Sequence, residues 1–488
     1  MSHDNSIAGR SKHQKIGLFL GPSISAVMLL SGAPDDLSTQ AWTTAALGML
    51  MAVWWATEAV PIAVTALLPL VCFPLFGIAS IQDTAAPYSN KVIYLFLGGF
   101  IVAFAMQRWN LHRRIALNVL QYVGGSGRSL IGGFMLASAV ISMWVMNTST
   151  TMMMLPIAVS IIAVIHKTVT GLDDKAKQDF QYALLLGVAY GATIGGIATL
   201  IGTAPNAMFA AFMQENYGTE IDFASWMLVG LPLSAAMLPL AWLALTRVVF
   251  KVDFVTSGEG RAELKRMKND LGRITVPEIR VAIIFLFMAF MWVGRPLLTQ
   301  LPGLSALDDS GIAVAGAIAL FLVPSGEKSD PLLLRWQYAE RLPWGVLILF
   351  GGGLTLASAV TRTGLAEWLG GSLQAVGMLP LAVIVIITAA MIIFLTELTS
   401  NTATTATFLP IVGAIALESG LDPIVLMVPV TFAASCAFML PVATPPNAIV
   451  FGSGLLTIPK MARAGLALNI IGIFLVSLVA LTLAPRFL

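Results

Sequence analysis

The sequence predicts an all-α polytopic membrane protein that is built from two related halves. Of its 488 residues, 57% are hydrophobic and only 11% are charged, whereas soluble domains are nearer a quarter charged. Apolar runs long enough to cross a bilayer recur along the chain, and they are continuous rather than alternating in twos, which favours helices over a β-barrel. Polar motifs interrupt two of these runs, and the motifs are a repeated pair.

Eleven apolar segments are expected to cross the membrane. They lie at residues 16–31, 41–57, 61–77, 92–107, 182–212, 224–247, 281–298, 310–324, 344–361, 424–451 and 464–485. Two further apolar regions, at about 130–165 and 379–417, contain the polar motifs. Each is long enough to enter the membrane and leave on the same side, so the sequence predicts two re-entrant hairpins in addition to the spans.

The basic residues predict the orientation of the chain. With the N-terminus in the cytoplasm, all but four of the 27 Lys and Arg residues fall on the inner side, as the positive-inside rule requires. The exceptions are Lys91, Arg295, Arg362 and Arg486. Residues 1–40 would form a polar tail and an uncleaved first span, and residues 251–280 a charged cytoplasmic loop or surface helix. The expected location is the inner (plasma) membrane.

Composition and short motifs argue against several classes of function. A net charge of +2 does not favour a nucleic acid partner. Cys72 and Cys436 lie in apolar runs, and the four histidines lie in or beside polar segments, so neither residue type suggests a resident metal site. No GxSxG or HExxH motif is present. We therefore expect neither an enzyme nor an organic cofactor.

The most informative feature is an internal duplication. NTSTTMMMLPI at 147–157 and NTATTATFLPI at 401–411 agree at seven of eleven positions and lie 254 residues apart. Two more pairs follow the same order: 95–111 with 349–365 at the same spacing, and GTAPN at 202–206 with ATPPN at 443–447 at a spacing of 241.

These paired blocks predict two homologous halves, at about 41–250 and 281–488. The orientation expected from the basic residues makes the halves inverted, an arrangement typical of secondary transporters. The alternative is that these Asn, Ser and Thr residues serve only as polar contacts between membrane helices.

The paired Asn-Thr runs have groups that can hold an anion without a basic side chain. Each run is expected at a hairpin tip, where the free N–H groups and the positive end of a helix dipole attract anions. Pro205, Pro445 and Pro446 are expected to break the opposing helices, whose free carbonyls attract cations. Neither tip contains an obvious arginine, so bound cations would supply the remaining positive charge and couple the two ligands. Glu397, four residues before Asn401, would either support the cation site or bind a proton.

WWATEAVPIAVTALLPL at 54–70, the paired Asn-Thr motifs and ATPPN together resemble the divalent anion/sodium symporters, also called the INDY family, over almost the whole chain. The resemblance implies a homodimer in membrane lipid, with a scaffold domain and an elevator-like transport domain in each subunit. It implies a small di- or tricarboxylate or other divalent anion as substrate, with co-transported sodium ions.

The function expected first is sodium-coupled symport of four-carbon dicarboxylates, such as succinate, malate or fumarate, into the cytoplasm. Sodium-independent anion exchange of di- or tricarboxylates, sulfate transport and an anion channel are the alternatives.

The resemblance also implies the site residues. The substrate would be bound by Asn147, Thr148, Ser400, Asn401 and Thr402, with Thr203 and Thr444 also facing it. The first sodium site would be Ser142, Asn147 and Gly202, and the second would be Thr396, Asn401 and Ala443. One position departs from the family pattern: Met146 stands where a serine is expected, whereas its counterpart Ser400 keeps the hydroxyl. A thioether is a weak acceptor and no donor, so the number of sodium ions stays open.

Overall fold

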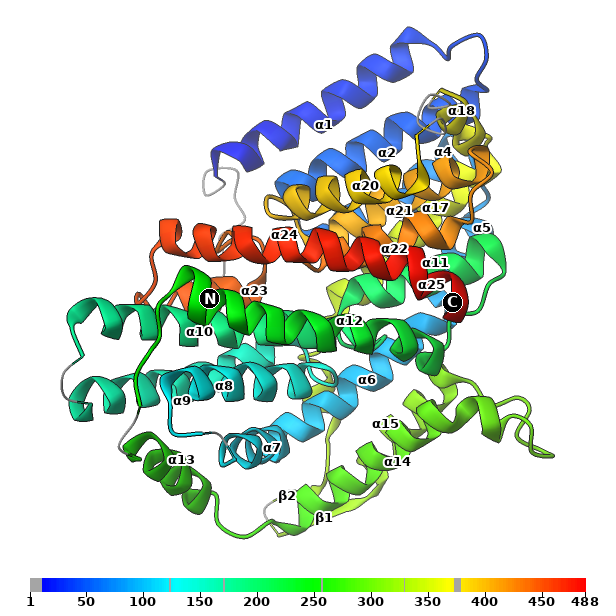
Figure 1. Cartoon of the computed structure of the whole chain (residues 1–488). Helices are drawn as coiled ribbons and strands as arrows, with labels where there is room; N and C mark the ends of the chain where they lie inside the picture. Colours follow the sequence, from blue (N-terminus) through cyan, green and yellow to red (C-terminus); the bar gives the residue numbers. More distant parts are fainter. Residues whose placement is uncertain (1–10, 123, 170–171, 256–257, 329, 373–378) are drawn as a thin grey trace.

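The computed structural model describes residues 11–122, 124–169, 172–255, 258–328, 330–372 and 379–488 (Figure 1). Within these residues, every regular element is a helix except one short two-stranded hairpin, which confirms the predicted all-α class. The first part of the expected polar tail, residues 1–10, lies outside the described residues.

The N-terminal region contains three helices of 18 to 20 residues and several shorter elements. They are α1 (Lys12–Ser31), α2 (Thr39–Thr57), α3 (Ile62–Thr65), α4 (Leu68–Leu75), α5 (Ile81–Ala85), the 3₁₀ helix η2 (Ala86–Ser89), α6 (Lys91–Arg108) and α7 (Leu111–Leu120). The span expected at 61–77 is divided into the two helices α3 and α4. Pro69 has no N–H to donate to the carbonyl of Thr65, so the helix cannot continue through this point.

The first predicted hairpin and the helices after it follow. They are α8 (Gly127–Ser142), α9 (Asn147–Thr168), α10 (Asp174–Ile197), α11 (Ala204–Tyr217), α12 (Phe223–Leu243) and the π-helix η3 (Ala244–Val249). With 16 residues, α8 is about 24 Å long, which is less than the roughly 30 Å hydrocarbon core of a bilayer. A helix of this length suits a re-entrant arm.

The middle of the chain forms the lower edge of the molecule in Figure 1. It comprises α13 (Glu259–Asp270), α14 (Val276–Leu298), α15 (Asp309–Leu322), the strands β1 (Pro324–Glu327) and β2 (Asp330–Leu332), and α16 (Trp336–Ala339). The surface helix considered for residues 251–280 is present as α13. The β1–β2 hairpin was not expected from the sequence.

The second half repeats the helix order of the first. It comprises α17 (Trp344–Arg362), α18 (Leu365–Ser372), α20 (Leu381–Thr396), α21 (Asn401–Glu418), α22 (Pro423–Ala434), α23 (Pro445–Phe451), α24 (Ile458–Thr482) and α25 (Ala484–Phe487). The arm α20 has 16 residues, as α8 does. The two predicted hairpins therefore correspond to α8–α9 and α20–α21.

Two segments expected as single spans are each divided into two helices. Segment 182–212 is formed by α10 and α11, with a break at 198–203, and segment 424–451 is formed by α22 and α23, with a break at 435–444. Pro205 stands in the first turn of α11, and Pro445 and Pro446 open α23. A proline in the first helical turn lacks an N–H that would have no helix partner anyway, so it favours starting a new helix there.

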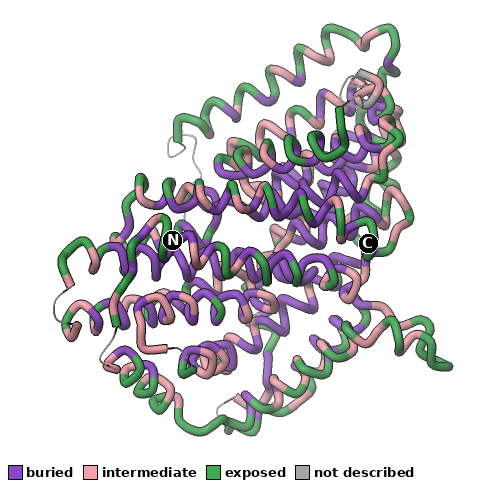
Figure 2. The backbone as a smooth tube through the Cα atoms, in the orientation of Figure 1, coloured by how far each residue is buried: buried purple, intermediate pink, exposed green. Residues whose placement is uncertain are grey.

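Burial separates central helices from outer ones (Figure 2). In the most apolar window of each helix, 94% of the α10 residues are buried, against 17% in α1 and in α14. The exposed side chains of α14 include Ile283, Leu286, Phe287 and Phe290. Such an apolar outer face is expected for a helix in contact with lipid.

Eight helical stretches of the described residues have the length and hydropathy to cross a membrane. They are Lys12–Ser31, Ile81–Arg108, Asn147–Thr168, Asp174–Ile197, Phe223–Val249, Val276–Leu298, Trp344–Arg362 and Ile458–Phe487. Shorter apolar helices, among them the hairpin arms α8 and α20, accompany them. These helices are those of a polytopic membrane protein; the number of eleven spans remains a prediction.

Candidate functional site

The tip of the first hairpin brings an amide against a hydroxyl. α8 ends at Ser142 and α9 begins at Asn147, so these residues flank the tip loop. The Ser142 hydroxyl donates to Asn147 Oδ1 at 2.5 Å. Gly196 of α10 lies against the same amide, since a Cβ added there would stand 2.5 Å from Asn147 Oδ1. Only glycine lets the end of α10 approach the tip this closely.

The tip of the second hairpin repeats this contact. α20 ends at Thr396 and α21 begins at Asn401. Thr396 Oγ1 lies 2.9 Å from Asn401 Oδ1 and 3.0 Å from the carbonyl oxygen of Ala434, at the end of α22. Each half therefore pairs a hydroxyl at the end of one hairpin arm with the amide that begins the other.

The breaks in α10–α11 and α22–α23 contain the predicted residues Gly202 and Ala443. An asparagine from the following helix holds the unwound backbone in both breaks. Asn206 Nδ2 lies 2.7 Å from the carbonyl oxygen of Thr199 in its break, and 3.1 and 3.3 Å from those of Gly196 and Ile197 at the end of α10. Asn447 Nδ2 donates to two carbonyl oxygens of its break at 3.0 and 3.3 Å. The two breaks thus share a local structure in which carbonyl groups are gathered, and gathered carbonyls attract cations.

A direct contact between the two breaks joins the halves. Thr203 Oγ1 lies 3.2 Å from Ser435 Oγ. A Cβ added at Gly196 would stand 3.0 Å from Thr203 Cγ2, and Ser435 directly follows the residue that Thr396 contacts. A series of close contacts and one peptide bond therefore connects Asn147 with Asn401. The series runs through Gly196, Thr203, Ser435, Ala434 and Thr396.

The sequence did not point to Ser435. This residue belongs to no repeated block, and the position 241 residues earlier is Ile194, which has no polar side chain. The counterparts Thr203 and Thr444 also differ, because Thr444 Oγ1 accepts from Asn447 N at 3.3 Å and so caps its own helix. Ser435 could be found only once α22 and α11 were placed side by side.

Four helices begin at this locus, namely α9, α11, α21 and α23. The first N–H groups of any helix have no partner within that helix. The N-cap residues Met146 and Ser400 make no side-chain hydrogen bond to the first turns of α9 and α21. The free N–H groups and the positive dipole ends at the tips therefore favour an anion.

Exposure separates the predicted substrate residues from the predicted sodium residues. Half-buried are Asn147, Thr148, Thr203, Ser400, Asn401 and Thr402. Buried are Ser142, Gly202, Thr396, Ala443 and Thr444. The residues expected to meet the anion are thus half-buried except Thr444, and those expected to meet sodium are buried except the two shared asparagines.

A large apolar cavity of about 570 Å³ lies beside the second hairpin, between α2, α17, α18 and α20–α21. Its lining includes Thr399 and Thr404, whose hydroxyl oxygens lie 2.6 Å apart in a mutual hydrogen bond. Neither Asn147 nor Asn401 lines it. This cavity therefore does not belong to the candidate site.

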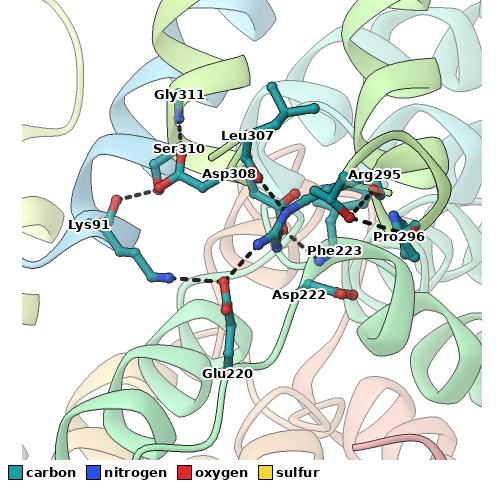
Figure 3. Close-up of polar contacts among 12 residues, drawn as sticks. Lys91, Glu220, Asp222, Phe223, Arg295, Pro296, Leu307, Asp308, Ser310 and Gly311 are labelled. Atoms are coloured by element: carbon teal, nitrogen blue, oxygen red, sulfur yellow. Dashed lines mark hydrogen bonds and ion pairs between the residues drawn. The ribbon is translucent and has the colours of Figure 1, made fainter. Parts of the chain in front are cut away.

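An ion-pair cluster ties the α11–α12 loop to α6, α14 and α15 (Figure 3). Glu220 Oε1 accepts from Lys91 Nζ at 2.9 Å and from Arg295 Nη2 at 3.0 Å. Asp309 Oδ2 accepts from Phe223 N at 2.8 Å. The hydrogen bond from Lys91, with a further one from Arg295, lowers the pKa of Glu220 against the opposing effect of burial. Lys91 and Arg295, which the basic-residue pattern assigned to the same outer side, share one partner.

Stacked aromatic rings connect this cluster with the first hairpin tip. The ring of Phe223 stacks on Trp292 of α14 at a centroid distance of 4.7 Å and on Trp144 at 5.9 Å. Trp144 lies in the tip loop, three residues before Asn147. Phe223 of α12 therefore lies between α14 and the first tip loop.

Known proteins resemble this chain over nearly its whole length. The family described as sodium:sulfate symporter transmembrane region matches residues 12–485. The sodium-dependent dicarboxylate transporter SdcS of Staphylococcus saprophyticus is 42% identical over 477 residues, which covers 97% of this chain and 92% of the relative. SdcS of Staphylococcus aureus is 41% identical over 478 residues, with the same coverage of 97% and 92%.

A solved structure shares the fold at low sequence identity. The YdaH transporter of Alcanivorax borkumensis superposes with a TM-score of 0.57 at 12% identity, covering 96% of this chain and 97% of that one.

The fold, the paired tips and these relatives define a polytopic membrane transporter and not an enzyme. Within that class, the chain belongs to the sodium:sulfate symporter family. The resemblance to divalent anion/sodium symporters is thereby confirmed.

Proposed function

We propose that this protein is a sodium-coupled symporter that carries four-carbon dicarboxylates, such as succinate, malate and fumarate, into the cytoplasm. The relatives named as sodium-dependent dicarboxylate transporters support both the substrate class and the coupling ion. The observation that carries the proposal is the pair of matching contacts, Ser142 with Asn147 and Thr396 with Asn401, at two helix starts joined by Thr203 and Ser435.

In this proposal, the substrate lies between the two tips. A dicarboxylate has two negative ends, and two helix N-termini offer one anion-attracting end to each carboxylate. The side chains that would donate to or face the substrate are Asn147, Thr148, Thr203, Ser400, Asn401, Thr402 and Thr444. The binding then needs no arginine, because dipoles and bound cations balance the charge.

Sodium would be held directly behind the substrate. The first site would use Ser142, Asn147 and Gly202, and the second Thr396, Asn401 and Ala443. Each asparagine would then contribute to both ligands, its side-chain oxygen to the ion. Sodium binding would replace the hydroxyl-to-amide hydrogen bond in each tip, since both oxygens can turn toward the ion. This shared use of Asn147 and Asn401 is the physical basis of the proposed coupling.

The architecture we infer has two inverted halves, at about 41–250 and 281–488, with re-entrant hairpins at about 130–165 and 379–417. The matching breaks and matching hairpin tips support the duplication. A homodimer in the plasma membrane, with a cytoplasmic N-terminus and an elevator-like movement of the hairpins with the broken helices, completes the proposal.

The test is uptake of labelled succinate into proteoliposomes with and without a sodium gradient. We expect initial uptake to fall at least about tenfold when choline replaces sodium, since the anion then lacks its counter-charges. An inside-negative potential should raise uptake if sodium charge exceeds substrate charge, because 100 mV is worth about 2.3 kcal/mol per charge. Uptake that does not depend on sodium would refute symport and favour anion exchange. Competition by sulfate but not by malate would show that the substrate is sulfate and not a dicarboxylate.

A further inference from the structure

Glu397 is a buried acid beside the second hairpin tip. It directly follows Thr396, and only 3% of its surface is exposed. No ion pair found among the described residues includes it. A carboxylate in a membrane protein without a basic partner is costly unless hydrogen bonds and another cation stabilise it.

Four hydrogen bonds hold the carboxylate. Glu397 Oε1 accepts from the backbone N–H groups of Phe438 and Met439 at 2.8 and 2.9 Å, and Oε2 accepts from that of Leu440 at 3.0 Å. The fourth donor is the side-chain amide of Asn469 in α24, 2.9 Å from Oε1. Because both oxygens accept from N–H donors, this is an environment for an ionised carboxylate, which only accepts.

The three backbone donors lie in the break between α22 and α23. Without the carboxylate, three consecutive N–H groups, one buried and two part-buried, would lose their partner, which a folded backbone rarely tolerates. The carbonyl of Leu440 in turn accepts from Ala443 N at 3.2 Å and from Asn447 Nδ2 at 3.0 Å. Glu397 therefore fixes the course of the chain that leads to Ala443, a residue of the proposed second sodium site.

The first half has no such acid. The residue 254 positions before Glu397 is Met143, and there Thr199 Oγ1 donates to the Met143 backbone carbonyl at 2.5 Å. The contact between tip loop and break is thus kept in both halves, although a neutral carbonyl takes the place of the carboxylate. In the chain, the proposed sodium ligand Thr396 is followed by an acid, whereas its counterpart Ser142 is followed by the uncharged Met143.

We propose that Glu397 is a positioning residue that shapes the second cation site and gives it a negative charge, so that sodium occupies the second site more tightly than the first. The inference rests on the proposed function, because it assumes that cations bind at both tips. A cation at the second site is the counter-charge that the buried carboxylate lacks. Sodium binding would then begin at the second tip, and the first tip would fill at higher sodium concentration.

The test compares Glu397→Gln with Met143→Gln, a matched change at the counterpart position. Two quantities are measured: sodium-dependent thermal stabilisation of the purified protein, and the sodium concentration that gives half-maximal succinate uptake. We expect Glu397→Gln to raise the half-saturating sodium concentration of thermal stabilisation, which reports the tighter second site, about tenfold or more, and Met143→Gln to change it less than about twofold. The half-saturating concentration for uptake should also rise in Glu397→Gln, but less, because the weaker first site limits it. Glu397→Asp, which keeps the charge, should lie closer to the wild type than Glu397→Gln does.

A purely structural role would lower the yield or maximal uptake of Glu397→Gln without moving its sodium dependence, and that result overturns the inference. If Glu397→Gln does not fold, Ser142→Ala and Thr396→Ala give the answer with Glu397 intact. The Thr396 change should then shift the sodium dependence of thermal stabilisation more, and the reverse order overturns the proposal. Failure of the proposed function is distinguishable, because the wild-type protein itself would then show no sodium-dependent stabilisation or uptake.

Discussion

The two hairpin tips have the same amide–hydroxyl contact but differ in the groups around it. Ser142 with Asn147 and Thr396 with Asn401 are equivalent pairs. Around the second pair stand the oxygen-bearing residues Ser400 and Glu397, whereas the equivalent positions in the first tip are Met146 and Met143.

The first tip, by contrast, has the closer packing against backbone. Gly196 lets α10 touch the first tip, whereas the equivalent residue in the second break, Ala437, already has a Cβ. The first tip is thus held by close packing against a backbone, and the second by a carboxylate. The two tips thus share the amide–hydroxyl contact and differ in the groups packed around it.

The largest expected effect comes from Asn401→Ala. It removes an amide that serves both the proposed substrate site and the proposed second sodium site. Initial dicarboxylate uptake should therefore fall about 100-fold, because two hydrogen bonds to charged ligands are lost. Asn269→Ala, an exposed amide on α13, is the control and should transport normally. The comparison between the tips fails if Asn147→Ala is clearly the more harmful change, and the site assignment fails if Asn401→Ala transports at the normal rate.

Gly196→Ala tests the close packing of the first tip. The added methyl group would stand 2.5 Å from Asn147 Oδ1, so the amide must shift. We expect the half-saturating sodium concentration to rise about tenfold, as overpacking of a tight contact implies. Ala437→Gly is the matched change in the second half and should alter this concentration less than about threefold. Equal effects of the two substitutions would mean that the breaks do not differ in packing.

Met146→Ser should make the first tip more like the second. The new hydroxyl restores one oxygen, so uptake should still depend on sodium. The half-saturating sodium concentration should fall about threefold, because one modest hydrogen bond contributes about that much to affinity. Titration of uptake with sodium measures it. Met152→Ser, on an exposed position of α9, should leave the curve unchanged. A loss of sodium dependence in Met146→Ser would contradict the proposed first site.

Glu220→Gln should have the smallest effect. Since Lys91 and Arg295 lower the pKa of Glu220 in the folded protein, the stabilisation is present at neutral pH and is lost as the pH falls through the lowered pKa, below the ordinary value of 4.5. The melting temperature should therefore drop by about 1–2 °C at pH 7, and the difference from wild type should shrink toward pH 3. Glu340→Gln, at an exposed position, is the control. A difference that grows on acidification would show that the cluster does not stabilise the fold.

Much of the frame could be predicted because its signals are local. The hairpins expected at 130–165 and 379–417 are α8–α9 and α20–α21, since an apolar run interrupted by Asn-Thr needs no distant partner to be recognised. The breaks before α11 and α23 likewise follow from prolines in the sequence.

Other parts of the site depend on partners far away in the chain. Ser435 meets Thr203 across 232 positions, and Glu220 reaches Arg295 across 75. No repeated pattern marks these pairs, and the sequence therefore pointed to neither.

The amino-acid order by itself determined the membrane class, the duplication and the two polar tips, because hydropathy and internal similarity are properties of neighbouring or equally spaced residues. Only the tertiary structure decided that Glu397 turns toward the backbone of residues 438–440 and that Met143 offers a carbonyl in its place. A buried charge is defined by what surrounds it, and those surroundings exist only once α20, α22 and α24 are packed together.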